Sequence, residues 1–134
     1  MKTIKEGVGF SAETMISGQD LATAHGSGSL PVYATPAMVA FMENTACKLL
    51  EPYLQEGETT VGISIDVKHI KANLTGMKLY CQAALIAVEG RKYVFDIEVC
   101  DALSTVGTAR HERFLVLSDP FLKKAKENKV NCDK

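Results

Sequence analysis

The feature that most constrains this sequence is a helix-compatible segment that is apolar on nearly every side. Thr35-Pro36 is a typical start signal, because threonine can cap free backbone N–H groups and proline fits the first helical turn. From Pro36 to about Tyr53, the first half of the segment is almost continuously apolar: Ala37, Met38, Val39, Ala40, Phe41 and Met42. A helix of this kind is expected to be buried on every side. The rest of the chain should therefore wrap around it.

Outside this helix, apolar and polar residues alternate along the chain, which indicates strands. The predicted strands cover residues 8–16, 61–69, about 77–88, 93–99 and about 105–117. In the strand 61–69, the alternation places Val61, Ile63, Ile65, Val67 and His69 on one face, and Gly62 on the other. Glu89-Gly90-Arg91 is typical of a short hairpin connection.

One apolar helix with antiparallel strands predicts an α+β domain, in which a curved sheet wraps around a long central helix. The 134 residues fit one domain, 1–134. After Ser118-Asp119-Pro120 we expect one or two helical turns and then a partly disordered tail, within residues 118–134. A unit of one sheet and one helix leaves strand edges open, which predicts a homodimer. Assemblies larger than a dimer are compatible with the sequence.

Composition and charge exclude several classes of function. The formal net charge is −1, which gives no electrostatic basis for binding nucleic acid or an anionic membrane surface. No stretch approaches the roughly 20 apolar residues that span a bilayer, and the N-terminus lacks the apolar core of a signal peptide. The four cysteines show no metal-ligand spacing, which favours reduced thiols in a cytoplasmic protein and no metal site.

Two polar residues interrupt the apolar pattern. Glu43 lies in the middle of the apolar helix, and His69 takes a core position in the strand 61–69. If that strand packs on the helix, both side chains point into the same interior. A buried carboxylate needs a partner or changes its pKa, so such pairs mark functional sites as often as satisfied structural residues.

Other polar positions have simple structural explanations. The structural role expected for Thr35 is to cap the helix. The structural role expected for Gly62 is to relieve crowding in the strand, and its functional role would be to leave a backbone N–H open to a substrate carbonyl. His25 lies in a Gly/Ser loop and is expected to be exposed. His111-Glu112-Arg113 lies in the last strand, where charged residues usually mark a solvated face.

The chain resembles the fluoroacetyl-CoA thioesterase-like family of hot-dog proteins. The matches keep the order and spacing of the family from the first strand to Leu117, with Glu43 eight residues after Thr35 and His69 twenty-six residues after Glu43. The matching segments are residues 27–36, Met42-Glu43, Ala46-Cys47, residues 62–69, Val88-Glu89-Gly90-Arg91 and His111-Glu112-Arg113.

The resemblance implies a hot-dog fold, dimers with active sites near the subunit interface, and hydrolysis of acyl-CoA. It places the catalytic threonine, glutamate and histidine of the family on Thr35, Glu43 and His69, and its thioester-side glycine on Gly62. Coenzyme A then enters as part of the substrate, with Arg113 as a candidate contact, and no cofactor is implied. The loop Gly26–Leu30 lacks the phenylalanines of the fluoroacetyl-specific members, which favours another small or short acyl group.

Several alternatives stay open at the level of sequence. The nucleophile is Thr35, Glu43 or a water molecule. A hot-dog hydratase or dehydratase would change acyl-chain unsaturation without releasing a thiol. A non-catalytic acyl-CoA binding protein on the same scaffold would bind without turnover.

Overall fold

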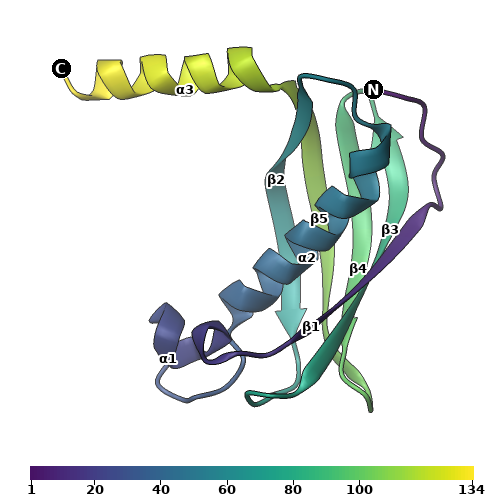
Figure 1. The fold of residues 1–134 in the computed structure, drawn as a ribbon, viewed down its shortest axis with the longest axis vertical. Coiled ribbons are helices and arrows are strands. Elements are labelled where there is room, and N and C mark those ends of the chain that lie inside the picture. The colour runs from purple at the N-terminus through teal and green to yellow at the C-terminus, as the bar shows by residue number, and fades with distance from the viewer.

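The computed structural model describes all residues 1–134 and contains one curved five-stranded antiparallel sheet with a long helix lying across its inner face (Figure 1). The strands are β1 (Gly9–Met15), β2 (Glu58–His69), β3 (Lys78–Glu89), β4 (Lys92–Cys100) and β5 (Thr105–Leu117). The helices are α1 (Ala22–His25), α2 (Thr35–Leu50) and α3 (Ser118–Cys132), with 3-10 turns η1 (Gly18–Asp20) and η2 (Glu51–Tyr53). The predicted α+β class and all five predicted strands are confirmed.

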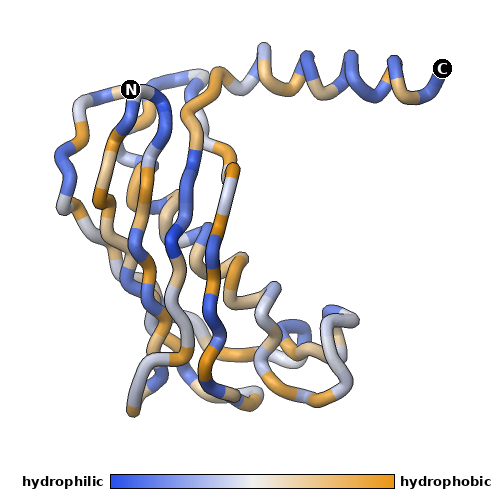
Figure 2. Tube along the Cα trace, turned by 180° about the vertical axis from the view of Figure 1, so that it is seen from behind, coloured by the Kyte–Doolittle hydropathy of each residue, from blue (hydrophilic) through white to orange (hydrophobic).

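The strand order is β1-β3-β4-β5-β2, which leaves β1 and β2 as the two edges. The core lies between α2 and the inner face of the sheet, where side chains such as Met38, Met42, Leu85 and Phe95 are fully buried. Seen from the outer side of the sheet, polar and apolar residues alternate along the strands (Figure 2). This alternation is expected where one sheet face packs on a helix and the other faces solvent.

The helix α2 departs from the sequence expectation in two ways. Ala34, not Thr35, is its N-cap residue, and no side chain caps the helix. Thr35 is the first helical residue, and its hydroxyl contacts His69 instead. In addition, α2 is not buried on every side in a single chain, because Ala40 is exposed and Phe41 is only half-buried. An apolar helix face is therefore left without a protein neighbour.

A β-bulge in β2 changes which residues face the core. The pairing register between β2 and β5 shifts between Gly62 and Ser64, so Ile63 is an extra residue. Gly62 pairs with Arg113, and Ile65 pairs with His111. Paired residues share a face, so Gly62 lies on the inner face with Ile65, Val67 and His69. The predicted two-face assignment was thus wrong before the bulge: Gly62 faces inward, and Ile63 is 51% exposed.

The C-terminal segment forms one continuous helix, longer than the one or two turns expected from the sequence. The helix α3 has no buried residue and extends away from the body of the sheet, on the side of the β2 edge (Figure 1). Its first residue is anchored beside β2, since Ser118 N donates to Gly57 O at 2.8 Å. None of the helices has both the length and the apolar character needed to cross a lipid bilayer.

Candidate active site

The first turn of α2 and the end of β2 bring Thr35 and His69 together. Thr35 Oγ1 lies 2.8 Å from His69 Nδ1, a hydrogen-bond distance. Tyr33 packs its ring edge-on against the imidazole, with centroids 6.0 Å apart and an interplanar angle of 79°. The histidine is thus held between a hydroxyl and an aromatic ring. This is the geometry of a hydroxyl paired with a general base.

His69 has one ring nitrogen without a partner. Its Nε2 atom is buried and makes no hydrogen bond within the chain. Burial lowers the pKa of His69, while a backbone contact to Lys71 opposes the shift. The imidazole is therefore neutral near pH 7 and able to accept a proton. If the Thr35 hydroxyl donates to Nδ1, then Nε2 carries the proton and needs an acceptor.

A hollow of about 510 Å³ lies in front of this pair. The loop after α1 forms one of its walls, and Ile70 and Lys71, which follow β2, contribute to another. The first part of the loop contributes Ser27, Gly28, Ser29 and Leu30, none of them aromatic, and Leu30 is largely exposed. The one aromatic side chain that this loop presents to the hollow is Tyr33, which lies beside His69. His25 is exposed, as expected, and does not line the hollow.

Glu43 lies in a different place, about two turns further along α2. Its Oε2 atom accepts an ion-paired hydrogen bond from Arg113 Nη1 at 3.3 Å, and the glutamate side chain is 41% exposed. The Arg113 side chain is nearly buried, and its remaining donors reach Thr60 Oγ1 at 3.0 Å and Thr60 O at 3.1 Å. The structure therefore provides a half-exposed carboxylate that is paired with a fixed guanidinium.

Gly62 is the strand residue beneath this carboxylate. A Cβ atom at position 62 would lie only 2.6 Å from Glu43 Oε2 and 3.3 Å from Arg113 Nη1. Any side chain would therefore displace the carboxylate. Glycine is needed here for close approach, and the approaching group visible in the structure is Glu43 itself.

The segment 111–113 is not the solvated face that the sequence suggested. Glu112 points outward and bonds to Ser64 Oγ at 2.6 Å, but His111 and Arg113 are buried on the inner face. Sequence reasoning missed His111 as a member of the site. The alternation of β5 carried a signal, because His111 and Arg113 have the same parity as the inward-facing Gly107 and Ala109.

Within one chain, the structure separates the two residues that were expected to share a pocket. Gly62, beside Glu43, and His69 are seven residues apart on β2, which corresponds to roughly 20 Å at about 3.3 Å per residue. Thr35 and Glu43 are likewise about 12 Å apart along α2 at 1.5 Å per residue. Glu43 lines a hollow of about 220 Å³ with Gly62, Ser64 and His111, and His69 does not reach it.

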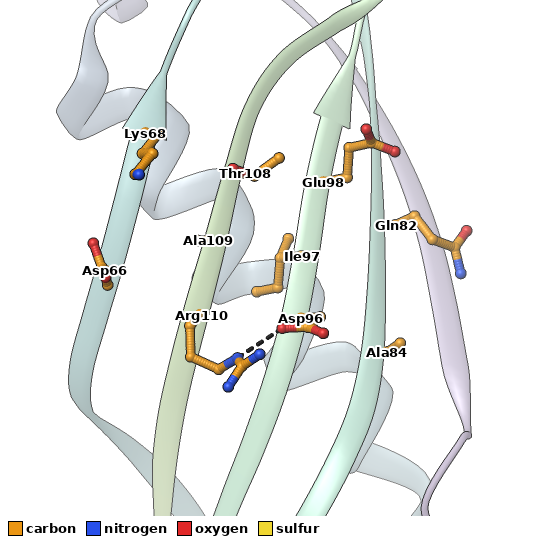
Figure 3. A pocket seen from close by; sticks show the side chains of 10 residues that line it. All are labelled: Asp66, Lys68, Gln82, Ala84, Asp96, Ile97, Glu98, Thr108, Ala109 and Arg110. Atoms are coloured by element: carbon orange, nitrogen blue, oxygen red, sulfur yellow. Dashed lines mark hydrogen bonds and ion pairs between the residues drawn. The ribbon is translucent and has the colours of Figure 1, made fainter.

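A larger hollow, of about 540 Å³, lies on the opposite face of the sheet (Figure 3). Its charged residues stand on neighbouring strands, and Arg110 Nε donates to Asp96 Oδ1 at 2.7 Å. More than half of each of these two side chains is exposed, so the pair contributes little to stability. The hollow holds no nucleophile paired with a base. The inner-face residues are therefore the better candidates for chemistry.

Comparison with known proteins places this chain in a family. The family model described as fluoroacetyl-CoA-specific thioesterase matches residues 16–119. The fluoroacetyl-CoA thioesterase of Streptantibioticus cattleyicolor is 32% identical over 96 residues, which are 72% of this chain and 69% of that protein.

Solved structures agree with this assignment. A structure of a fluoroacetyl-CoA thioesterase superposes with a TM-score of 0.89 at 26% identity, covering 94% of this chain and 98% of the other. A thioesterase-superfamily member from Thermus thermophilus superposes with a TM-score of 0.91 at 26% identity, covering 99% and 98%. The predicted hot-dog fold and the resemblance are thereby confirmed, and the chain belongs to the fluoroacetyl-CoA-specific thioesterase family, a family of thioester hydrolases.

Proposed function

We propose that this chain hydrolyses a small or short acyl-CoA thioester at a site shared between two copies of the chain. One observation carries the shared site: His69 Nε2 makes no hydrogen bond within its chain, while Glu43 presents a half-exposed carboxylate too far away in the same chain. A second copy supplies the missing carboxylate. In this proposal Thr35 and His69 of one subunit act with Glu43 of the partner subunit.

The open edge of the sheet supports this pairing. The strand β2 is 12 residues long and has no neighbour beyond β5. Antiparallel pairing of β2 with its own copy gives a two-fold dimer, closes the β2 edge of each chain and keeps the inner faces on one side. A register that pairs Ile65 with Val67 of the partner subunit brings the partner's His69 opposite the Gly62–Ile63 bulge. Glu43 lies directly above that bulge.

Two further surfaces are explained by the same dimer. The half-exposed apolar face of α2, with Ala40 and Phe41, would lie next to α2 of the partner subunit. The helix α3 extends past the β2 edge and carries exposed Phe121 and Leu122, so it would lie across the partner subunit. An isolated helix of 15 residues gains little stability without packing, which favours such a contact.

The proposed chemistry uses each group according to its protonation. His69 Nδ1 accepts the proton of the Thr35 hydroxyl, or of a water held by it, while Nε2–H donates to the partner's Glu43. The activated oxygen attacks the thioester carbonyl, and His69 then delivers its proton to the departing thiolate. If the oxygen is that of water, the free acid forms directly; if it is that of Thr35, a water activated by His69 then cleaves the threonyl ester and restores the hydroxyl. Overall, one water adds across the C–S bond: the acyl carbon gains a hydroxyl, and sulfur gains a proton.

Gly62 and Arg113 support this reaction from the strands. Gly62 leaves room for Glu43 and allows the thioester carbonyl to approach the backbone, where an N–H would stabilise the oxyanion. Because the Arg113 guanidinium already binds Thr60 and Glu43, we assign it to holding the carboxylate rather than to contacting coenzyme A. The loop 26–30 lacks an aromatic lid, which supports a small acyl group other than fluoroacetyl. Four free cysteines support a reducing, cytoplasmic location.

Subunit complementation tests the proposal. Glu43→Gln and His69→Ala chains, each nearly inactive in thiol release from acetyl-CoA and short-chain acyl-CoAs, are co-refolded in equal amounts. Half of the dimers are then mixed, and each mixed dimer has one intact site, so about a quarter of the wild-type activity returns. The matched control mixes Thr35→Ala with His69→Ala, which damages the same side of the site and restores nothing.

Two outcomes would contradict the proposal. If the mixture of Glu43→Gln chains and His69→Ala chains regains no activity although mixed dimers form, the site does not combine these residues across subunits. If the wild-type protein binds acyl-CoA but releases no thiol from any of these substrates, hydrolysis itself is wrong, and a binding protein becomes the better interpretation.

A further inference from the structure

His111 is buried to 99% beside the candidate site, but it has no role in the chemistry described above. Its Nδ1 atom lies 2.7 Å from Ser64 O, and its Nε2 atom lies 3.1 Å from Arg113 Nη1. A carbonyl oxygen can only accept and a guanidinium can only donate. Nδ1 must therefore carry the proton, and Nε2 must be the bare acceptor.

This assignment leaves one protonation state that satisfies every contact. In the charged form, the Nε2–H would face an arginine N–H with no acceptor between them. Burial and the neighbouring Arg113 both lower the pKa of His111, although Ser64 O and the carboxylate of Glu43 oppose the shift. The groups facing the ring thus favour a neutral imidazole near pH 7.

The Arg113 Nη1 group joins this histidine to the candidate catalytic carboxylate. It contacts His111 Nε2 at 3.1 Å and Glu43 Oε2 at 3.3 Å. The other guanidinium donors are fixed by Thr60. Removing the acceptor at Nε2 would leave one side of Nη1 without a partner, and the guanidinium could then turn away from Glu43.

The same ring occupies the β-bulge of β2. Ser64, whose carbonyl accepts from Nδ1–H, follows directly after the register shift, and the ring carbon Cε1 would be 3.3 Å from a Cβ at Gly62. Phe95 packs on the ring from the other side, with centroids 6.1 Å apart. His111 therefore contacts the bulged strand, the arginine and the core at once.

We infer that His111 is a positioning residue that orients Glu43 through Arg113, by accepting a hydrogen bond at Nε2 and holding the bulge at Ser64. Both ring nitrogens are taken up by Ser64 and Arg113, so His111 acts on the carboxylate through the arginine. The inference rests on the proposed catalytic role of Glu43, and it adds a residue on which the geometry of that carboxylate depends. Misplacement of a catalytic group by about 1 Å can cost on the order of 100-fold in rate.

Two substitutions separate positioning from packing. His111→Phe keeps a ring against Phe95 but removes both nitrogens, so it should preserve the folded state and lower kcat about tenfold to 100-fold, with KM little changed. His111→Gln fits the core less well, but its amide oxygen can accept from Arg113, so it should retain more of kcat than the phenylalanine variant. A purely structural histidine would give the opposite order, because phenylalanine fills the buried site better.

A double substitution tests the route through Glu43. In a Glu43→Gln background, His111→Phe should lower the remaining rate no further, since the carboxylate it orients is already gone. A further loss of the same size as in the wild-type background would overturn the inference. So would wild-type kcat in a well-folded His111→Phe protein. Near-full activity of the Glu43→Gln single variant would instead contradict the proposed function. The two failures can be distinguished, because this variant leaves His111 unchanged.

A measurement on the unmodified protein covers the case in which His111→Phe does not fold. Nitrogen-15 NMR of the histidine side chains should show His111 as the neutral Nδ1–H tautomer near pH 7. Observation of the Nε2–H tautomer or of an imidazolium at that pH would exclude an acceptor at Nε2 and overturn the inference.

Discussion

The two ends of the inner face of β2 differ in how completely the chain satisfies their polar groups. At the His69 end, one hydrogen bond joins Thr35 to the imidazole, and Nε2 is buried without a partner. At the Gly62 end, Glu43 is tied to Arg113, whose other donors are taken up by Thr60 and His111. The His69 end therefore holds a histidine with one unsatisfied ring nitrogen, and the Gly62 end holds a carboxylate in a fixed position.

This difference indicates that the two ends have different roles in the proposed reaction. A buried ring nitrogen without a hydrogen-bond partner destabilises the folded chain. Such an atom is therefore expected where a second molecule supplies the missing partner. A carboxylate whose position is set by a guanidinium needs no reorganisation when a second group reaches it. The two ends are therefore complementary, and the two-fold axis across β2 that we propose would join them.

The largest expected effect concerns the coupling of the two ends. Glu43→Gln and His69→Ala should each lower kcat about 10²- to 10⁴-fold, and the double substitution should cost little more than the worse single one. Glu43→Gln is nearly isosteric, so its thermal unfolding midpoint should stay close to that of the wild type. Turnover and unfolding are measured on the same preparations. Loss of activity in proportion to loss of stability would make Glu43 a structural carboxylate.

A smaller effect is expected from adding one methyl group at the Gly62 end. Gly62→Ala would place Cβ 2.6 Å from Glu43 Oε2, so the carboxylate must move. A shift of about 1 Å should lower kcat/KM by on the order of 100-fold. Gly18→Ala, in η1, is the matched control, because no atom lies within 4 Å of the added Cβ and residue 18 lines neither hollow at the candidate site. Equal activity of the two variants would show that the position of Glu43 is not critical.

Acidification should affect stability through the histidines at both ends. Burial lowers the pKa of His69 and of His111 in the folded state. The unfolded chain then binds more protons than the folded chain at mildly acidic pH, so stability falls as the pH drops below the unfolded histidine pKa of about 6.5. Thermal unfolding at about pH 7.5 and pH 5.5 measures this fall, and His111→Gln should reduce it. An equal fall in wild type and variant would contradict the contribution of His111.

The smallest effect is expected for acyl selectivity at the His69 end. Without an aromatic lid in the loop 26–30, kcat/KM for fluoroacetyl-CoA should lie close to the values for acetyl-CoA and other short acyl-CoAs. Thiol release across these substrates measures the ratio. A preference above about a thousandfold, which corresponds to about 4 kcal/mol of transition-state discrimination, would mean that another element of the protein supplies the selectivity.

Much of the fold could be predicted from the sequence, because hydrophobic period is a local property. The apolar segment after Thr35 and the alternation in the later strands gave the long helix and the sheet, with the boundaries of β5 reproduced at Thr105 and Leu117. The C-terminal helix was underestimated, since a polar segment without a periodic apolar face gives little signal. The apolar pattern also singled out Glu43 and His69, and the family resemblance added Thr35, but neither gave the positions of the three residues relative to one another.

The sequence by itself determined the fold class and the kinds of chemical group available: a hydroxyl, a carboxylate and an imidazole in an apolar setting. Only the tertiary structure decided their partners. The bulge at Ile63 reversed the face of Gly62, the pairing of β2 with β5 buried His111 and Arg113 under Glu43, and the length of β2 separated Glu43 from His69. The physical reason is that alternation and helical period depend on neighbours in the chain, whereas register, bulges and hydrogen-bond partners depend on residues from distant strands.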